Sequence, residues 1–384
     1  MMRSWPPNEL LCCFLWQAVA VLAAATEPEV PGLPPALVLD HGGLFRPQAL
    51  GGRDLILLTL AFSADGKTIA SAGGGPGEKD APAQGEVKLW EVATGRLLRT
   101  LTVENGIVFH AEYSPDGQCL ATASGPGTST RTTPGEIRLW SPATGRLAGK
   151  LTGHDCGAYV AAFSPDGRRL ASGGIATIDA SRPAAVRGGN ATGDLKLWDL
   201  QTGRELWTGR GHSGAVAGLV FSPDGKTLAS SGGLSDGNVK LWDAAAGTQR
   251  RTFPCEAEVV RPVAFGPKSD SLTILSFGLT GPQPPQPFTV QISRWNLIET
   301  QPLEAVSIRN GNAYRLALSH DGGLLACACH DGVKVYDVRR QVELCSFPSQ
   351  LRTRPVSFSP DDSLLAAGCD DGTVKVWNVA GIRK

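Results

Sequence analysis

The sequence lacks an excess of charge of either sign, because 36 Lys and Arg residues balance 36 Asp and Glu residues over 384 positions. A broad nucleic-acid footprint would need a basic excess, and a membrane-binding surface would need a polybasic patch. The nine cysteines follow no regular spacing, so they are not the framework of a small disulfide-rich protein. Aromatic residues make up only 7%, whereas 47 Gly and 27 Pro residues indicate many turns and short strands.

Long apolar runs are absent as well, with one exception at the N-terminus. Arg3 precedes LLCCFLWQAVAVLAA (residues 10–24), and three alanines offer a small-residue cleavage site before Thr26. This order predicts a secretory signal peptide over residues 1–25. The run is short for a membrane span of about 20 residues, but an uncleaved anchor at residues 10–25 is the alternative.

Export has consequences for the start and the location of the mature protein. Residues 26–35 are then a Pro-rich spacer ahead of the folded domain. The protein is expected outside the cytoplasm, in the periplasm or secreted, unless the apolar run anchors it in the membrane. N-terminal sequencing of the natural protein would then begin close to Thr26.

One phrase, an aromatic residue followed by Ser-Pro-Asp-Gly, returns along the rest of the chain. Its copies are FSADG (62–66), YSPDG (113–117), FSPDG (163–167), FSPDG (221–225), FGPKS (265–269), LSHDG (318–322) and FSPDD (358–362). Each copy precedes an apolar strand, and the strand after that one ends at a large aromatic residue. These residues are Trp90, Trp140, Trp198, Trp242, Trp295, Tyr336 and Trp377. Such a repeat predicts a radial architecture in which no unit buries its own face alone.

The repeats resemble WD40 repeats, because most third strands end in a segment such as KLWD and Gly-His stands at 153–154 and 211–212. The resemblance implies an all-β, seven-bladed propeller over residues 36–384, with four strands in each blade. The last copy has only three strands, so ALVLD at residues 36–40 is expected to complete it and close the ring. Together with the leader, the resemblance predicts an exported, bacterial-looking member of the family.

The length of the repeats varies only between the second and third strands. In WD40-like propellers these hairpins share one face, the top, with the loops that enter the inner strand. The long connections lie in repeats 1, 2, 3 and 5, at residues 73–86, 124–136, 173–199 and 278–293. Insertions confined to one face are typical of a binding face, and neutral variation in loop length is the alternative.

The innermost strand carries a second signal, four residues before the aromatic residue of each repeat. Aliphatic residues five and two positions before it predict a β-bulge, which re-aims the side chain between them. That side chain is Leu58, Phe109, Tyr159, Ala217, Arg261, Tyr314 and Arg354 in the seven repeats. The resemblance places this position near the top mouth of the central channel.

Aromatic and Arg side chains dominate binding hot spots, which favours a partner-binding surface over side chains that only fill the channel. The predicted surface consists of Phe109, Tyr159, Arg261, Tyr314 and Arg354, with Arg131, Arg182 and Arg187 on the loops around it.

Other residues could be drawn as a hydrolytic site. In WD40 repeats the matching positions form a structural hydrogen-bond chain, and the resemblance implies this role for His212, Ser230, Asp236 and Trp242. His154, Ser172 and Trp198 repeat most of the chain in the third blade, where Asp194 is out of register. The other blades lack the Gly-His pair and are expected to depend on packing.

Two further motifs are better explained by structure than by chemistry. Ser235 in GLSDG matches a nucleophile pattern, but a strand follows it where that motif needs a helix. Cys327, Cys329 and His330 could suggest a thiolate metal site. Small core residues beside a turn are the preferred interpretation.

The prediction is therefore a non-catalytic scaffold that binds a protein or peptide partner on the top face. No cofactor, metal or nucleic acid is expected, and no membrane contact beyond the possible N-terminal anchor. The alternative is a propeller enzyme whose active site lies in the inserted loops, which offer Glu78, Asp80, Asp179 and Asp236. These acids form no repeated pair, which favours binding over catalysis.

Overall fold

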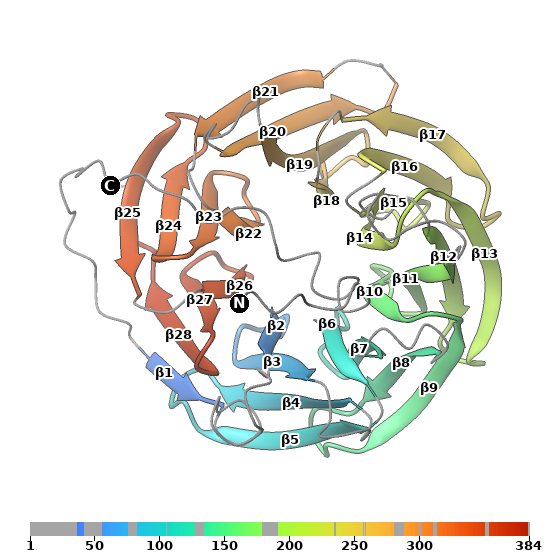
Figure 1. Cartoon of the computed structure of the whole chain (residues 1–384), viewed down its shortest axis with the longest axis horizontal. Helices are drawn as coiled ribbons and strands as arrows, with labels where there is room; N and C mark the ends of the chain where they lie inside the picture. The colour runs from blue at the N-terminus through green and yellow to red at the C-terminus, as the bar shows by residue number, and fades with distance from the viewer. Residues whose placement is uncertain are drawn as a thin grey trace, which may run out of the picture.

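The computed structural model consists of seven four-stranded sheets arranged around a central axis (Figure 1). It describes residues 37–41, 56–75, 83–104, 106–126, 134–178, 191–233, 236–255, 257, 259–279, 288–298, 302–309, 313–349 and 353–382. In each sheet consecutive strands pair antiparallel, from the axis outwards. The predicted all-β, seven-bladed propeller is confirmed.

The strands fall into four concentric sets. The inner strands are β2 (Ile56–Phe62), β6 (Ile107–Tyr113), β10 (Ala158–Phe163), β14 (Val216–Phe221), β18 (Val259–Phe265), β22 (Ala313–Leu318) and β26 (Thr353–Phe358). The second strands are β3 (Thr68–Gly75), β7 (Leu120–Gly125), β11 (Arg169–Ile178), β15 (Thr227–Gly232), β19 (Ser271–Leu279), β23 (Leu324–Cys329) and β27 (Leu364–Cys369). The third strands are β4 (Gln84–Glu91), β8 (Gly135–Trp140), β12 (Ala191–Asp199), β16 (Asn238–Asp243), β20 (Phe288–Asn296), β24 (Gly332–Asp337) and β28 (Thr373–Asn378). The outer strands are β5 (Leu97–Glu104), β9 (Leu147–His154), β13 (Arg204–His212), β17 (Gln249–Pro254), β21 (Pro302–Arg309), β25 (Val342–Pro348) and β1 (Leu37–Asp40).

The repeated Ser-Pro-Asp-Gly phrase forms the turn between the inner and second strands. In the first blade the Ser63 hydroxyl donates to Asp65 Oδ1 (2.7 Å) and accepts the Thr68 N–H (3.0 Å). Gly66 has a φ of 69°, in the left-handed region that glycine adopts without steric cost. Ser269 and Asp362 take the same conformation in two degraded copies, with φ of 58° and 57°. The turn geometry therefore survives the loss of glycine.

The core lies between blades, where the large aromatic residue of one sheet packs on its neighbour. Trp377, for example, stacks on Phe347 of the preceding blade with ring centroids 4.7 Å apart. Each of the seven interfaces is a separate hydrophobic cluster. No blade buries its faces alone, so the sheets stabilise one another around the ring.

The ring closes as the sequence predicts. Strand β1 pairs antiparallel with β28, with Leu37 opposite Val376 and Asp40 opposite Thr373, and completes the last blade. Leu39 is 1% exposed and packs with Leu57, Ile69 and Trp90 of the first blade and with Val374 and Val376 of the last blade. The clasp thus removes an unpaired sheet edge and joins the two ends of the propeller.

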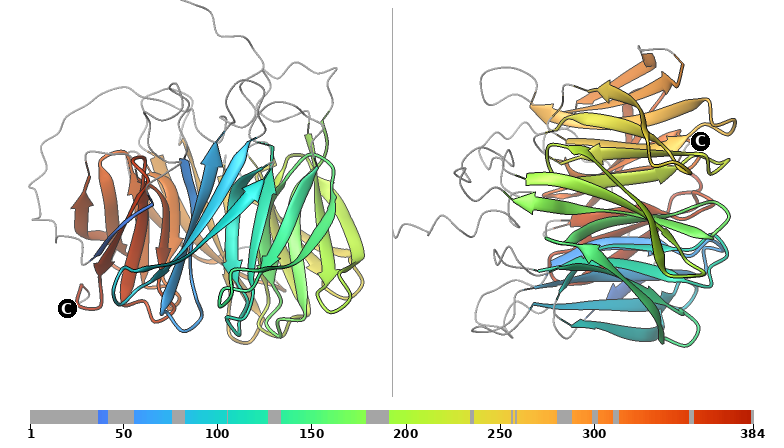
Figure 2. Two further views of the ribbon diagram at one scale, coloured as in Figure 1. Left: turned by 90° about the horizontal axis from the view of Figure 1, so that it is seen from below. Right: turned by 90° about the vertical axis from the view of Figure 1, so that its right-hand side faces the viewer.

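The two faces of the disk differ in their connections (Figure 2). We call the face where the inner strands begin the top, and the face with the Ser-Pro-Asp-Gly turns the bottom. The strands that flank the long connections extend further towards the top than expected: β11 runs to Ile178 and β12 starts at Ala191. A register shift between Ile175 and Thr177 lets the pairing continue. The connection in the third blade therefore spans residues 179–190, shorter than the sequence indicated.

The predicted signal peptide or anchor (residues 1–25) and the spacer (residues 26–35) lie outside the described residues. Over the described ranges, from Leu37 to Ile382, no helix is long and apolar enough to cross a membrane.

Candidate functional site at the top of the inner ring

The seven inner strands surround the axis (Figure 1), and each contains an irregularity near its top end. The pairing with the second strand shifts register once in every inner strand, and in six of the seven strands the shift lies where the sequence predicts a bulge. The shifts lie at Leu57/Thr59, Val108/His110, Ala158/Val160, Val216/Gly218, Pro262/Ala264, Ala313/Arg315 and Thr353/Val356. The predicted bulge is confirmed in those six strands.

The residue singled out by sequence is the extra residue of the bulge in most strands. Phe109, Tyr159 and Tyr314 each stand between the two paired residues of their shift. In β18 the extra residue is Val263, because Arg261 still pairs with Leu275. The bulge in this blade therefore lies two residues further along than the sequence suggested, and Arg261 belongs to the regular part of the strand.

Phe109 and Tyr159 come from neighbouring blades and meet at the top. Their ring centroids are 4.9 Å apart and the planes are tilted by 41°. Both side chains are half-buried. Glycines leave room for them: a Cβ at Gly157 would lie 3.1 Å from the Tyr159 hydroxyl oxygen, and one at Gly125 would lie 3.5 Å from Phe109 Cε2. The pair is a partly exposed aromatic surface held on two bulged strands.

The remaining predicted residues are placed less fully. Arg261 is half-buried and its Nη1 donates to the carbonyl of Ala217 in β14, across the boundary between two blades. Tyr314 and Arg354 lie on β22 and β26, but their side chains are outside the described part of the structure. Arg131, Arg182 and Arg187 fall on connections outside the described residues.

The structure adds polar residues of the inner strands that the sequence analysis missed. Backbone N–H groups on the axial edge of an inner strand have no further strand to pair with, so they need other acceptors. Thr59 Oγ1 accepts the Ala111 N–H (3.3 Å), His110 Nδ1 accepts the Ala161 N–H (3.4 Å) and Glu112 Oε1 accepts the Phe163 N–H (3.0 Å). These side chains stand one or three residues after the bulged residue of their strand, so counting in steps of two from the residue that follows the bulge would have found them.

Charge is concentrated on this inner ring. Burial, reinforced by the charges of Arg261 and Arg315, lowers the pKa of His110 to about 4. His110 is therefore neutral at physiological pH, with Nδ1 as the acceptor and Nε2 carrying the proton. Burial also raises the pKa of Glu112 to about 7, against the opposing effect of its bond from Phe163 N–H. The inner ring thus contains two arginines and a carboxyl group, that of Glu112, whose pKa is well above the ordinary value.

Glu112 should make stability depend on pH. Its folded pKa of about 7 exceeds the ordinary value of 4.5, so unfolding between these pH values releases a proton. The free energy of unfolding should therefore fall as the pH rises through this window, by about 1–3 kcal/mol between pH 5 and pH 8. Glu112→Gln keeps an acceptor for Phe163 N–H but does not titrate. Urea unfolding at both pH values should show this part of the fall only in the natural protein. Equal falls in both proteins would contradict the assignment.

The residues of the expected hydrogen-bond chain lie together inside the third and fourth blades. In the fourth blade His212 Nε2 is 2.7 Å from Ser230 Oγ, which also accepts the Trp242 indole N–H at 2.8 Å. His212 Nδ1 bonds to Asp236, whose pKa burial would raise but hydrogen bonds from His212 and Asn238 lower. All these groups are committed to one another inside the blade, as structural bonds require.

The third blade corrects one detail. The sequence left Asp194 out of the chain because of its register, but its Oδ1 lies 2.8 Å from His154 Nδ1. His154 Nε2 is 2.7 Å from Ser172 Oγ, which accepts the Trp198 indole N–H at 2.8 Å. A register shift between Gly193 and Asp194 brings the carboxylate into place.

The first blade corrects another expectation, that blades without Gly-His depend mainly on packing. His41, which follows the clasp strand, is fully buried and its Nε2 lies 3.2 Å from the Ser71 carbonyl. Its Nδ1 is 3.3 Å from Glu86 Oε1, and Trp90 donates to Ser71 Oγ (2.8 Å). A related set of bonds thus recurs in the first blade, where the histidine comes from the N-terminal segment and contacts the backbone carbonyl of Ser71 instead of its hydroxyl. The same N-terminal segment therefore closes the ring through β1 and supports the first blade through His41.

Among the residues that the structure describes, the candidates for chemistry do not come together in one site. Within the described ranges, no group of three or more His, Cys, Asp or Glu residues could hold a metal ion. Cys327 and Cys329 are buried in a hydrophobic cluster of the sixth blade. Of the acids offered by the inserted loops, Asp236 is bonded to His212, and Glu78, Asp80 and Asp179 are outside the described residues, as is Ser235.

The closed ring and the bulged inner strands define a seven-bladed β-propeller, and its bonded Trp–Ser–His groups resemble those expected from WD40 repeats. Residues 145–180, 203–243 and 356–378 match the family described as "WD domain, G-beta repeat". A stretch of 68 residues is 37% identical to the target of rapamycin complex subunit LST8 of Saccharomyces cerevisiae, and covers 17% of this chain and 22% of the yeast protein. Neither match bears on export or on a bacterial origin, which stay predictions.

Proposed function

We propose that the protein is a non-catalytic scaffold that binds a protein or peptide partner at the top of the inner ring. The observation that carries the proposal is the Phe109–Tyr159 pair, two half-buried rings presented by bulged strands of adjacent blades. Rigid aromatic side chains at the centre of a surface are common binding anchors, because they bury a large area at a small entropic cost. The yeast relative is by its name a subunit of a complex, which supports a scaffold role.

Charge on the inner ring adds direction to the proposal. Arg261 and Arg315 both act on His110 electrostatically, and Tyr314 and Arg354 continue the predicted surface around the ring, with Arg131, Arg182 and Arg187 on its rim. The balanced net charge argues against nucleic acid as the partner. A segment that combines an apolar side chain with an acidic group suits rings and arginines together.

Truncating the ring pair should weaken partner binding. Peptides selected by display on the immobilised propeller provide ligands of measurable affinity. Phe109→Ala and Tyr159→Ala should each weaken binding by about 2 kcal/mol or more, roughly 30-fold in Kd. Leu206→Ala, on the exposed side of an outer strand, is the matched control and should leave the affinity unchanged.

Thermal unfolding of the same variants separates binding from packing. Losing the ring contact should cost about 0.5–1.5 kcal/mol of stability, less than the loss of binding. A fall in stability with unchanged affinity would show that the two rings only fill space at the top of the ring.

Export is the second part of the proposal. Residues 1–25 have the order of a signal peptide, and a partner would then be met outside the cytoplasm, or at a membrane if residues 10–25 remain as an anchor.

A further inference from the structure

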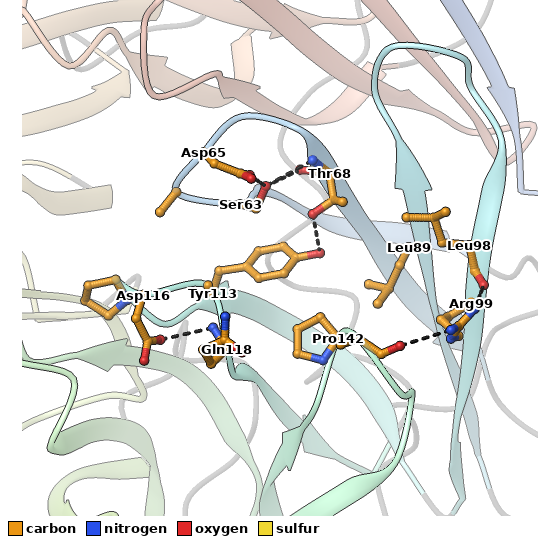
Figure 3. Close-up of a pocket in the computed structure, with 14 residues that line it drawn as sticks. Ser63, Asp65, Thr68, Leu89, Leu98, Arg99, Tyr113, Asp116, Gln118 and Pro142 are labelled. Atoms are coloured by element: carbon orange, nitrogen blue, oxygen red, sulfur yellow. Dashed lines mark hydrogen bonds between the residues drawn. The ribbon is translucent and has the colours of Figure 1, made fainter.

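A pocket of about 600 Å³ opens on the bottom face between the first two blades (Figure 3). The Tyr113 ring lies across its middle, with Pro142 and Leu98 on the side of the outer strands. This face is opposite to the top surface of the proposed function. Most blades carry a bulky side chain at the equivalent place, so the pocket calls for a physical cause.

The cause is one position, the second residue after the aromatic residue that ends each third strand, which we call the plug position. Its members are Val92, Pro142, Leu200, Ala244, Leu297, Val338 and Val379. In every blade but the second, the plug N–H donates to a carbonyl of the turn between the inner and second strands, as Leu200 does to Arg168 (3.0 Å). The aliphatic plugs pack into the cluster shared with the neighbouring blade, as Leu200 does beside Cys119 and Leu139.

The second blade cannot do this, because Pro142 has no N–H to donate. The equivalent acceptor would be the carbonyl of Gln118, which lines the pocket. Pro142 is also absent from the cluster between the first two blades, where Leu98 and Ala61 are the partly buried members. The second blade thus lacks both the hydrogen bond from the plug position and an aliphatic side chain that packs between the blades, which leaves the pocket between the first two blades open.

The fourth blade shows what fills such a gap when the plug is small. Its plug is Ala244, and the space is taken by Trp207 from the preceding blade, whose indole N–H donates to the Ala244 carbonyl (3.1 Å). The residue equivalent to Trp207 in the first blade is Arg99, since each pairs with the residue before the terminal Trp. Arg99 instead donates to the carbonyls of Leu98 (2.6 Å) and Ala143 (3.0 Å). The gap between the first and second blades therefore lacks an aromatic ring such as Trp207, which fills the gap between the third and fourth blades.

The residues that line the pocket indicate which residue should stand next to that ring in a ligand. Leu98 and Pro115 offer apolar surface above the buried Leu89, whereas Asp65 and Asp116 stand at the exposed rim. The pKa of each Asp is lowered, chiefly by a hydrogen bond from the serine of its turn, so both are ionised. The Tyr113 oxygen accepts from Thr68 Oγ1 (3.2 Å), which leaves its own hydrogen to donate.

We propose that this pocket is a second binding site, which takes an aromatic side chain of a partner polypeptide with a basic residue next to it. The ring occupies the space that Trp207 fills between the third and fourth blades. The basic residue meets the carboxylates of Asp65 and Asp116. The site is independent of the proposed top surface, and a partner that used both would grip the disk on two faces.

Three capped dipeptides probe the site: N-acetyl-Trp-Lys-amide, N-acetyl-Trp-Glu-amide and N-acetyl-Ala-Lys-amide, each titrated by ligand-observed NMR. The Trp-Lys probe should bind saturably and about 3-fold or more tighter than Trp-Glu, as exposed charge pairs contribute modestly. Ala-Lys should bind at least about 10-fold more weakly than Trp-Lys, because the ring provides most of the buried apolar area. Equal affinity for Trp-Lys and Trp-Glu would overturn the basic specificity, and no saturable binding of either Trp probe would overturn the site.

Two variants close the pocket by the protein's own solutions. Arg99→Trp copies Trp207, and Pro142→Leu restores the plug and its N–H as in Leu200. Each should lower the affinity for Trp-Lys at least about 10-fold, and Pro142→Leu should also raise Tm because it restores a hydrogen bond. Arg251→Trp is the matched control. It makes the same change in the fourth blade, where Leu297 already fills the gap to the fifth blade.

The outcomes separate this site from the top surface. Tyr159→Ala should leave Trp-Lys binding unchanged while it weakens the display-selected peptides. Unchanged binding of Trp-Lys by a folded Pro142→Leu protein would overturn the proposal, whatever the result at the top face.

Discussion

Leu39→Ala is expected to lower the free energy of unfolding by about 2–5 kcal/mol, the usual cost of removing a buried leucine side chain. Leu39 is 1% exposed and contacts residues of both the first and the last blade. A cavity there loosens β1 from β28 and exposes the edge of β28 that β1 covers from Thr373 to Val376. The effect should exceed that of a comparable cavity in a blade that is held on both sides.

Val38→Ala is the control for this change, since Val38 is 52% exposed on the same strand and pairs through the same backbone. It should stay within about 0.5 kcal/mol of the natural protein in urea unfolding. Deleting residues 27–33, upstream of the clasp, should likewise cost far less than deleting residues 37–41. A Leu39→Ala protein as stable as Val38→Ala would show that the ring does not depend on its clasp.

Ser172→Ala should destabilise the third blade by about 2–4 kcal/mol, because it leaves two buried polar groups without a partner at once. Ser172 Oγ accepts the Trp198 indole N–H (2.8 Å) and bonds to His154 Nε2 (2.7 Å). His154 Nδ1 already bonds to Asp194 Oδ1 (2.8 Å), so the histidine has no other bond that could replace the lost one at Nε2. Neither partner can turn to water, because His154 is 1% and Trp198 is 3% exposed.

Ser172→Thr is the matched control, since the second blade already uses Thr122 to accept the Trp140 indole N–H (3.0 Å). It keeps the hydroxyl and should recover most of the lost stability. Denaturant unfolding, with near-UV circular dichroism to follow the tryptophans, measures both variants. If Ala and Thr prove equally costly, steric fit and not the hydrogen bond governs this position.

Local chemistry made much of this fold predictable. Ser63, Asp65 and Gly66 form a turn whose bonds span only a few residues, so the phrase that encodes it is legible wherever it recurs. The aromatic residue at the end of each third strand marks a fixed distance from that turn. The bulges at Phe109 and Tyr159 follow from spacing within one repeat, whereas the count of blades and the clasp at residues 36–40 follow from counting the copies and finding the last one a strand short.

Contacts between blades were not predictable in the same way. His41 follows the predicted clasp segment and had no predicted role, yet it braces the first blade through Ser71 and Glu86. Burial around the axis shifts the pKa values of Glu112 and His110, and the charges of arginines on other blades add to the shift of His110. A side chain that bonds to a group on the neighbouring blade gives no recognisable pattern within its own repeat.

By itself the sequence determined that this protein is built from seven small β units, because each is too small to bury its own faces alone, and the resemblance of these units to WD40 repeats implied a closed ring. Only the tertiary structure showed where a pocket opens between two neighbouring blades. Pro142 reads as an ordinary turn residue in the chain, and its missing N–H matters only because Gln118, Leu98 and Tyr113 surround the place where a plug would sit. Packing between blades is a property of pairs of distant residues, so the pocket it leaves was visible only after both blades were in place.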